Sequence, residues 1–197
     1  MNKTLFSLAA MVILSFYSCS SDDENQSSEE NFETYVFIPD ANFKAALVEN
    51  TAINTNEDEE ISESEAAAFD GNLAINGRNI EVLTGIEAFE NIQVLSAFNN
   101  AITEVDLSSN LALTQVLLEH NQLTTLDVSM LSLLEDLKVH TNDLQSLNVA
   151  NGNNENFTRM EAHNNEDLYC IVIDEDFEPT SSWNKDLATN YSFYTCL

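Results

Sequence analysis

The amino-acid sequence predicts an α/β solenoid, in which short parallel strands stack between a helical N-terminal cap and a disulfide-closed C-terminal cap. One observation is an asparagine that recurs every 21 residues, at Asn100, Asn121 and Asn142. Another is that apolar residues stand at the same offsets around each of these asparagines. Self-similarity at a short fixed period is typical of repeat architectures, whose units stack to bury one continuous core.

Residues 1–18 have the pattern of a secretory signal peptide. Lys3 supplies a positive charge, and the apolar run that follows is too short to span a bilayer as a helix. The run leads into Cys19 and resembles a bacterial lipobox, although Phe16 stands where that motif prefers leucine. We therefore expect Cys19 to be lipidated. Ordinary secretion, with Cys19 incidental, is the alternative.

Residues 19–34 are predicted to form a disordered acidic tether, because Ser20 to Asn31 contains no apolar residue. An acidic run directly after a lipidated cysteine resembles the surface-export signal of some Gram-negative lipoproteins. We expect an outer-membrane protein displayed at the cell surface and joined to the membrane only by its lipid anchor. A plain charged linker on a periplasm-facing protein is the alternative.

The charge balance narrows the classes of partner. The chain has 34 acidic and 6 basic residues, which gives a formal net charge of −28 at pH 7. Nucleic acids and anionic lipid surfaces both require a basic footprint, so we expect neither as a partner. The acidic surface is expected mainly to keep the protein soluble.

Residues 35–71 are predicted to form a helical cap. Asp40 is a good N-cap residue, and Ser62 with Glu65 forms a capping box before a second short helix. Apolar residues at helical spacing follow the first cap, namely Phe43, Ala46 and Leu47. The segment therefore reads as two short helices joined by a polar loop.

Residues 72–168 carry the repeats. The unit Leu134-x-x-Leu137-x-Val139-x-x-Asn142-x-Leu144 matches the leucine-rich-repeat pattern, and neighbouring units begin at Ile92, Leu113 and Phe157. Alternating apolar residues of each strand point into the core, and the asparagine side chain can satisfy backbone groups of the turn. One unit cannot bury its apolar face alone, so stacking is compulsory.

Residues 169–197 contain Cys170 and Cys196, the remaining pair of cysteines. Disulfides persist in exported proteins, so we expect these two residues to form a structural bridge. Closing a loop of this length contributes about 3–4 kcal/mol in the chain-entropy view.

Together these segments resemble the short-repeat, internalin-like leucine-rich-repeat lipoproteins of Gram-negative cell surfaces. Residues 80–89 are similar to the first repeat of that family, residues 38–70 to its helical cap, and Cys170–Asp174 with Trp183 and Cys196 to its C-terminal cap. The resemblance implies a curved solenoid with parallel strands on the concave side. It also implies a non-enzymatic protein that binds a protein or polysaccharide ligand, and we expect a monomer.

The strand positions between core residues are predicted to form lateral ladders on the concave face. The candidate ligand-binding residues are Phe98, Leu117, Glu119, Asp136, Lys138, His140, Arg159, Glu161 and His163. Phe98 and Leu117 are expected to be exposed apolar anchors. Opposite charges fall side by side twice, Asp136 with Arg159 and Lys138 with Glu161. The alternative is that these charge pairs only stabilise neighbouring strands.

Two metal hypotheses arise from the sequence. Residues 54–65 resemble an EF-hand calcium loop with Asn at its first position and Glu59 where glycine is needed. Its candidate ligands are Asn54, Asn56, Asp58, Glu60, Ser62 and Glu65. Zinc at His120, His140 and His163, beside Glu119 and Glu161, is the second hypothesis. The alternatives are a cap that keeps the EF-hand shape without the ion, and histidines that are only surface residues.

A second function class follows from the calcium hypothesis, namely a cation-binding or structural envelope lipoprotein. An enzyme is not expected. The sequence places no free cysteine beside a histidine, no glycine-rich phosphate loop and no serine in a nucleophile elbow.

Overall fold

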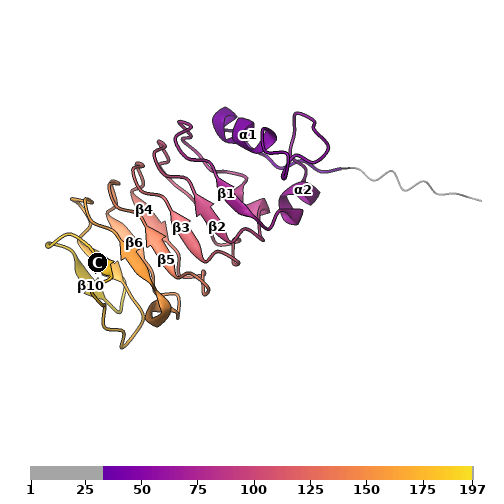
Figure 1. The fold of residues 1–197 in the computed structure, drawn as a ribbon. Helices are drawn as coiled ribbons and strands as arrows, with labels where there is room; N and C mark the ends of the chain where they lie inside the picture. The colour runs from indigo at the N-terminus through magenta and orange to yellow at the C-terminus, as the bar shows by residue number, and fades with distance from the viewer. Residues whose placement is uncertain (1–32, 197) are drawn as a thin grey trace, which may run out of the picture. The chain divides into compact units, whose positions relative to one another are not determined.

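Two parallel β-sheets run along the solenoid in the computed structural model, which describes residues 33–196 (Figure 1). The concave sheet contains, in spatial order, β1 (Asn72–Ala74), β2 (Val94–Ser96), β3 (Gln115–Leu117), β5 (Asp136–Lys138), β7 (Arg159–Glu161) and β9 (Trp183–Asn184). The second sheet contains β10 (Asn190–Ser192), β8 (Cys170–Val172), β6 (Ser146–Asn148) and β4 (Thr125–Asp127). The predicted leucine-rich-repeat solenoid is therefore confirmed.

The expected signal peptide, Cys19 and nearly all of the tether lie outside the described residues. Within residues 33–196, no helix is long and apolar enough to cross a membrane.

A constant register makes the core continuous. Each concave strand pairs in parallel with the next so that the central apolar residues lie opposite one another. These central residues are all fully buried, and they are Leu95, Val116, Leu137 and Met160. Every turn thus buries its apolar side chains against its two neighbours, as the repeat predicts.

The side chains of the repeated asparagines join neighbouring turns by hydrogen bonds. The Asn121 amide donates to the carbonyls of Ala97 and Leu118, both at 3.0 Å, and its Oδ1 accepts the Ile102 N–H at 3.0 Å. Asn142 makes the equivalent three bonds one turn further on. Each asparagine therefore satisfies buried backbone groups of its own turn and of the preceding one, which confirms the predicted role.

The N-terminal cap contains α1 (Ala41–Val48) and α2 (Glu63–Ala68), as predicted. One carboxylate oxygen of Asp40 caps α1 by accepting the N–H groups of Asn42 and Phe43. The other oxygen accepts the N–H groups of Glu81 and Val82, so the same side chain joins the cap to the first repeat. The capping box of Ser62 and Glu65 is present at the start of α2.

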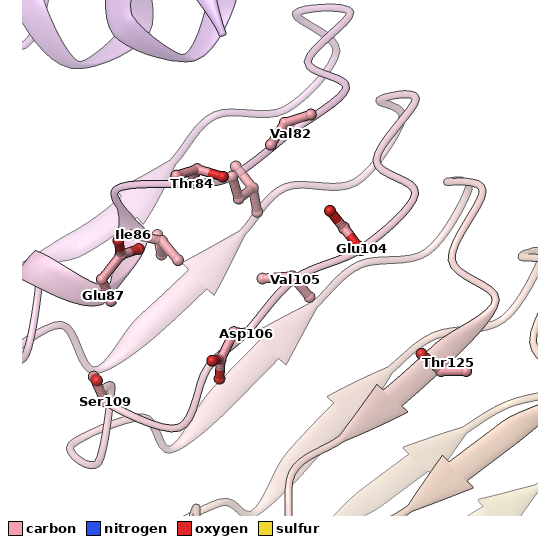
Figure 2. Close-up of a pocket in the computed structure, with 10 residues that line it drawn as sticks. Val82, Thr84, Ile86, Glu87, Glu104, Val105, Asp106, Ser109 and Thr125 are labelled. Carbon is pink, nitrogen blue, oxygen red and sulfur yellow. The ribbon is translucent and has the colours of Figure 1, made fainter. Parts of the chain in front are cut away.

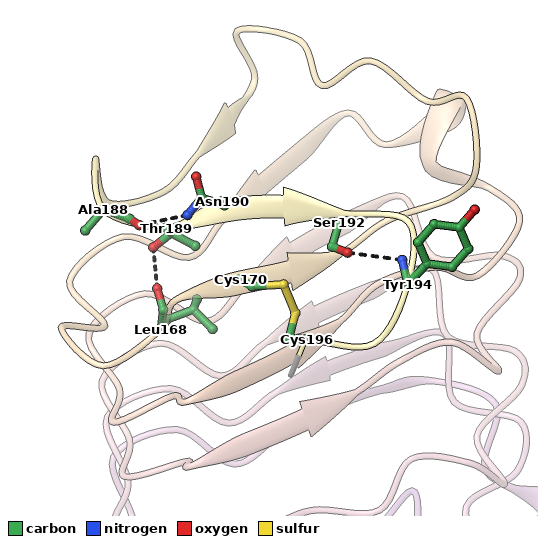
Figure 3. Close-up of a disulfide and its surroundings, with 8 residues drawn as sticks. All are labelled: Leu168, Cys170, Ala188, Thr189, Asn190, Ser192, Tyr194 and Cys196. Carbon is green, nitrogen blue, oxygen red and sulfur yellow. Dashed lines mark hydrogen bonds between the residues drawn. A yellow bond between two sulfur atoms is a disulfide. The ribbon is translucent and has the colours of Figure 1, made fainter.

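The C-terminal cap is closed by the predicted disulfide between Cys170 and Cys196, whose Cα atoms are 5.8 Å apart (Figure 3). Trp183 fills the end of the core against the rings of Phe157, Phe177 and Tyr191. Two single 3-10 turns complete the fold, η1 (Ile86–Ala88) and η2 (Asn154–Asn156). Strands β9 and β10 continue both sheets into the cap, which the sequence analysis did not predict.

Candidate binding face

The predicted ladders form three rows that lie side by side on the concave sheet. Strand register places Val94, Gln115, Asp136 and Arg159 in one row, and Ser96, Leu117, Lys138 and Glu161 in the next. Backbone hydrogen bonds from Asn99 to Glu119, from His120 to His140 and from Thr141 to His163 align the third row just beyond the strand ends. The structure therefore brings all nine predicted residues onto one face.

The face is longer than the sequence analysis predicted. Asn76 lies beside Phe98 at one end, where its Oδ1 accepts the Phe98 N–H at 3.1 Å. Asn184 lies beside His163 at the other end, with 3.1 Å between its amide nitrogen and His163 Nδ1. Asn184 was not predicted because the β9 segment lacks the repeat residues: Lys185 stands at an apolar position, and Ala188 stands where the repeat has asparagine.

Phe98 and Leu117 were predicted to be exposed anchors, but both are half-buried. The predicted extent of their exposure was therefore wrong. Leu117 lies in register between Ser96 and Lys138, and strands in a sheet are only about 4.8 Å apart. Side chains on neighbouring strands therefore cover much of each other. The two residues still offer part of their apolar surface at the same end of the face.

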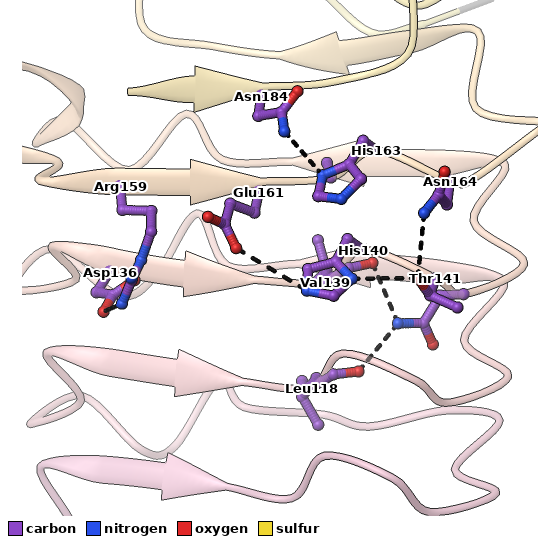
Figure 4. A network of polar contacts seen from close by, with 12 residues as sticks. Leu118, Asp136, Val139, His140, Thr141, Arg159, Glu161, His163, Asn164 and Asn184 are labelled. Atoms are coloured by element: carbon purple, nitrogen blue, oxygen red, sulfur yellow. Dashed lines mark hydrogen bonds and ion pairs between the residues drawn. The ribbon is translucent and has the colours of Figure 1, made fainter. Parts of the chain in front are cut away.

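Asp136 and Arg159 form the predicted ion pair (Figure 4). The two charges therefore compensate each other within the protein. Arg159 donates to both carboxylate oxygens of Asp136, and Gln115 donates to Oδ2 as well. Burial opposes ionisation of Asp136, but these hydrogen bonds and the arginine charge hold the pKa of its carboxyl below the ordinary value. Since Asp136 is also buried, it positions Arg159 and does not itself face a ligand, which corrects the prediction.

The second predicted charge pair is not formed. Lys138 and Glu161 are neighbours in register, but Glu161 Oε2 lies 3.9 Å from His140 Nε2 instead. Figure 4 shows Glu161 directed toward His140. The carboxylate of Glu161 thus points along the concave face toward His140 rather than toward Lys138.

The histidines form a short stack. The rings of His140 and His163 are nearly parallel, with centroids 4.6 Å apart, and His120 meets His140 edge-on at 5.3 Å. Burial and then the charge of His163 lower the pKa of His140, while Glu119 and Glu161 oppose this shift. Within residues 33–196, no three histidine, cysteine or acidic side chains are arranged to hold a metal ion, so the zinc geometry does not assemble.

The EF-hand-like loop is organised by its own hydrogen bonds. Glu65 Oε1 accepts from Thr55 N, Thr55 Oγ1 and Asn56 N, while its Oε2 accepts from Ser62 N and Ser62 Oγ. The Asn54 amide donates to the carbonyls of Val48 and Asp58. Calcium would have to displace these donors, because its site requires free carboxylate and carbonyl oxygens.

The other candidate calcium ligands are similarly engaged. Glu60 pairs with Lys44, and Asp58 accepts from Asn56 and from Glu60 N. The Oδ1 atom of Asn54 is buried without a hydrogen-bond partner, but it is one oxygen where calcium requires six to eight. The arrangement of these residues therefore does not fit the ion.

A shallow pocket of about 590 Å³ lies away from the concave face, beside β4 (Figure 2). Its polar lining includes Thr84, Glu87, Glu104, Asp106 and Thr125. Hydrogen bonds from Ser108 lower the pKa of Asp106. The pocket contains none of the predicted site residues.

The sequence matches no protein-family model and no curated protein. Among solved structures, the chain is similar to the functional domain of InlJ from Listeria monocytogenes, which includes a cysteine ladder. The TM-score is 0.51 at 25% identity, over 77% of this chain and 41% of that one. The fold is an internalin-like leucine-rich-repeat solenoid.

An internalin of Listeria monocytogenes, inlF, gives a TM-score of 0.49 at 19% identity, over 75% of this chain and 47% of that one. The chain therefore spans less than half the length of either solved structure.

Proposed function

We propose that the chain is a lipid-anchored cell-surface protein that binds a protein partner through its concave face and catalyses no reaction. The observation that supports this most is the arrangement of that face. Half-buried Phe98 and Leu117 stand at one end, and charged side chains continue from them in register on a rigid sheet. Residues fixed by packed strands are well suited to recognition, because little conformational freedom is lost on binding.

The location rests on the sequence. The lipobox-like segment before Cys19 and the acidic tether support a lipid anchor in an outer membrane and display at the cell surface. The likeness to InlJ supports the fold of the displayed part. Metabolic labelling with palmitate tests the anchor, because a Cys19→Ser variant should lose the label. Protease treatment of intact cells tests display, because a periplasmic protein would stay protected.

Binding is tested by pull-down with the processed chain from the proteins and polysaccharides of its native surroundings. The control combines Phe98→Ala, Leu117→Ala, Lys138→Ala and His140→Ala in one variant whose folding is checked by its unfolding curve. A protein retained by the native chain and lost by the control would support the proposal. A protein retained equally by both would move the binding site away from the concave face.

A further inference from the structure

Basic side chains are scarce in this chain, and within residues 33–196 all but one are engaged. Lys44 and Arg78 pair with Glu60 and Glu49, Arg159 pairs with Asp136, and Lys185 donates to the carbonyls of Asp186 and Thr189. The exception is Lys138, which has no hydrogen bond or ion pair with any described residue. It stands on β5, in the middle of the concave sheet.

Neither acidic neighbour of Lys138 forms an ion pair with it. Asp136, two residues earlier on the same strand, is held by Arg159 and Gln115. Glu161, its neighbour in register on β7, is directed toward His140. The ammonium group of Lys138 therefore remains the one uncommitted cation of the face, and its half-buried stem limits where it can reach.

The next row contains an acceptor that lacks a hydrogen-bond donor. The Oε2 atom of Glu119 is buried and has no hydrogen-bond partner. Its strand is joined to that of Lys138 by hydrogen bonds from Leu118 N to the Lys138 carbonyl and from His120 N to the His140 carbonyl. A buried acceptor without a donor is unfavourable, so a rotation of the Glu119 side chain that turns this oxygen outward to a ligand N–H or O–H group would gain free energy.

We propose that the partner is a protein segment that presents an aspartate or glutamate to Lys138 beside an apolar side chain on Phe98 and Leu117. This inference rests on the proposed function and specifies the chemistry of its partner. Leu117 and Lys138 are neighbours in register about 4.8 Å apart, and an extended chain advances about 3.3 Å per residue. The acidic and apolar side chains of the partner therefore lie one or two residues apart, and a nearby N–H or O–H group meets the Glu119 carboxylate once that side chain turns outward.

The overall charge of −28 does not prevent this contact. Charges separated by more than about 8 Å are largely screened at physiological salt, so the local environment of Lys138 decides the interaction. The adjacent carboxylate of Asp136 is neutralised by Arg159, so Glu119 and Glu161 are the carboxylates of the face that oppose an acidic partner. A protein segment is favoured over a uronic-acid polysaccharide, because the latter offers only the C–H faces of its rings, and no apolar side chain, to cover Phe98 and Leu117.

The test uses a phage-displayed library of random peptides selected on the processed full chain, followed by affinity measurement on single variants. Selected peptides should be enriched in aspartate or glutamate next to an apolar residue. Their affinity should fall about tenfold or more with Lys138→Gln and recover with Lys138→Arg. The matched control is Arg78→Gln, which also removes one positive charge but lies near the cap, and it should have no effect.

The outcomes separate this inference from the proposed function. Peptides weakened by Leu117→Ala but not by Lys138→Gln would leave the concave binding face intact and overturn the acidic partner. Peptides unaffected by either substitution, or a library without enrichment, would overturn both. Binding of alginate, a polyuronate, that depends on Lys138 in the absence of any selected peptide would replace the protein partner with an acidic polysaccharide.

Discussion

His140 and His163 stack with their ring centroids 4.6 Å apart and their planes inclined by 18°. Each ring is oriented by a different neighbour, His140 by the Thr141 hydroxyl and His163 by the Asn184 amide, both at 3.1 Å. Two imidazolium ions at this separation would repel each other, and the charges of Glu119 and Glu161 offset this repulsion only in part. The stack therefore favours at least one neutral ring, and this makes the face sensitive to pH.

The first prediction concerns this sensitivity. Burial and then the charge of His163 lower the pKa of folded His140, whereas an unfolded histidine titrates near 6.5. The contribution of His140 to stability is thus present above about pH 6.5 and is lost as the pH falls through the lower pKa of the folded state. Urea unfolding at several pH values between about 7.5 and 5 should show this loss.

Other groups also titrate in that range, so the comparison is with a His140→Gln variant. Glu119, Glu161, His120 and His163 face His140 and remain in both proteins. The stability difference between native and variant chains should shrink as the pH falls. A difference that stays constant with pH would show that His140 does not titrate as described.

The second prediction concerns a strained turn. The residue before each repeat asparagine has positive φ, and at Thr141 this angle is 58°. Asparagine tolerates this conformation, and it occupies the equivalent positions 99 and 164, whereas a β-branched residue is strained there. Thr141→Asn should therefore stabilise the protein by about 1 kcal/mol. Asn164→Thr is the matched reverse change, and its unfolding midpoint should fall by a similar amount.

The contrast between Asn142 and Lys138 explains how much of the molecule could be predicted from sequence. The hydrogen bonds of Asn142 repeat in each turn and depend only on the local backbone, so the periodic pattern predicts them. The partner of Lys138 depends on the rotamers of several neighbours. The register of Lys138 with Glu161 was predictable, but the competition of His140 for that carboxylate was not.

The third prediction concerns Glu65. Its buried carboxylate accepts five hydrogen bonds, and Glu65→Gln replaces one acceptor oxygen with a donor that faces N–H and O–H groups. The variant should lose about 3 kcal/mol of stability. Burial opposes ionisation, but the hydrogen bonds lower the pKa of Glu65, so this stability is present above about pH 4.3 and is lost below it.

The same contacts predict the response to calcium. Because Glu65 and Asn54 are held by protein donors, millimolar calcium should leave the Tm of the native chain unchanged. A Tm that rises with calcium and no longer does so in the Glu65→Gln variant would establish the loop as a calcium site.

The last prediction concerns the disulfide of the C-terminal cap. The bridge joins Cys170 on β8 to Cys196, 26 residues later (Figure 3). The loop that it closes contains β9, β10 and Trp183. Closing such a loop restricts the unfolded chain, so a Cys170→Ala, Cys196→Ala variant should lose about 3–4 kcal/mol. Within residues 33–196, β9 pairs only with β7 and β10 pairs only with β8, so each is the edge strand of its sheet. Hydrogen exchange should therefore increase first in β9 and β10, while β3 and β5 stay protected. Uniformly faster exchange in all strands would instead mean that the disulfide stabilises the solenoid as one cooperative unit.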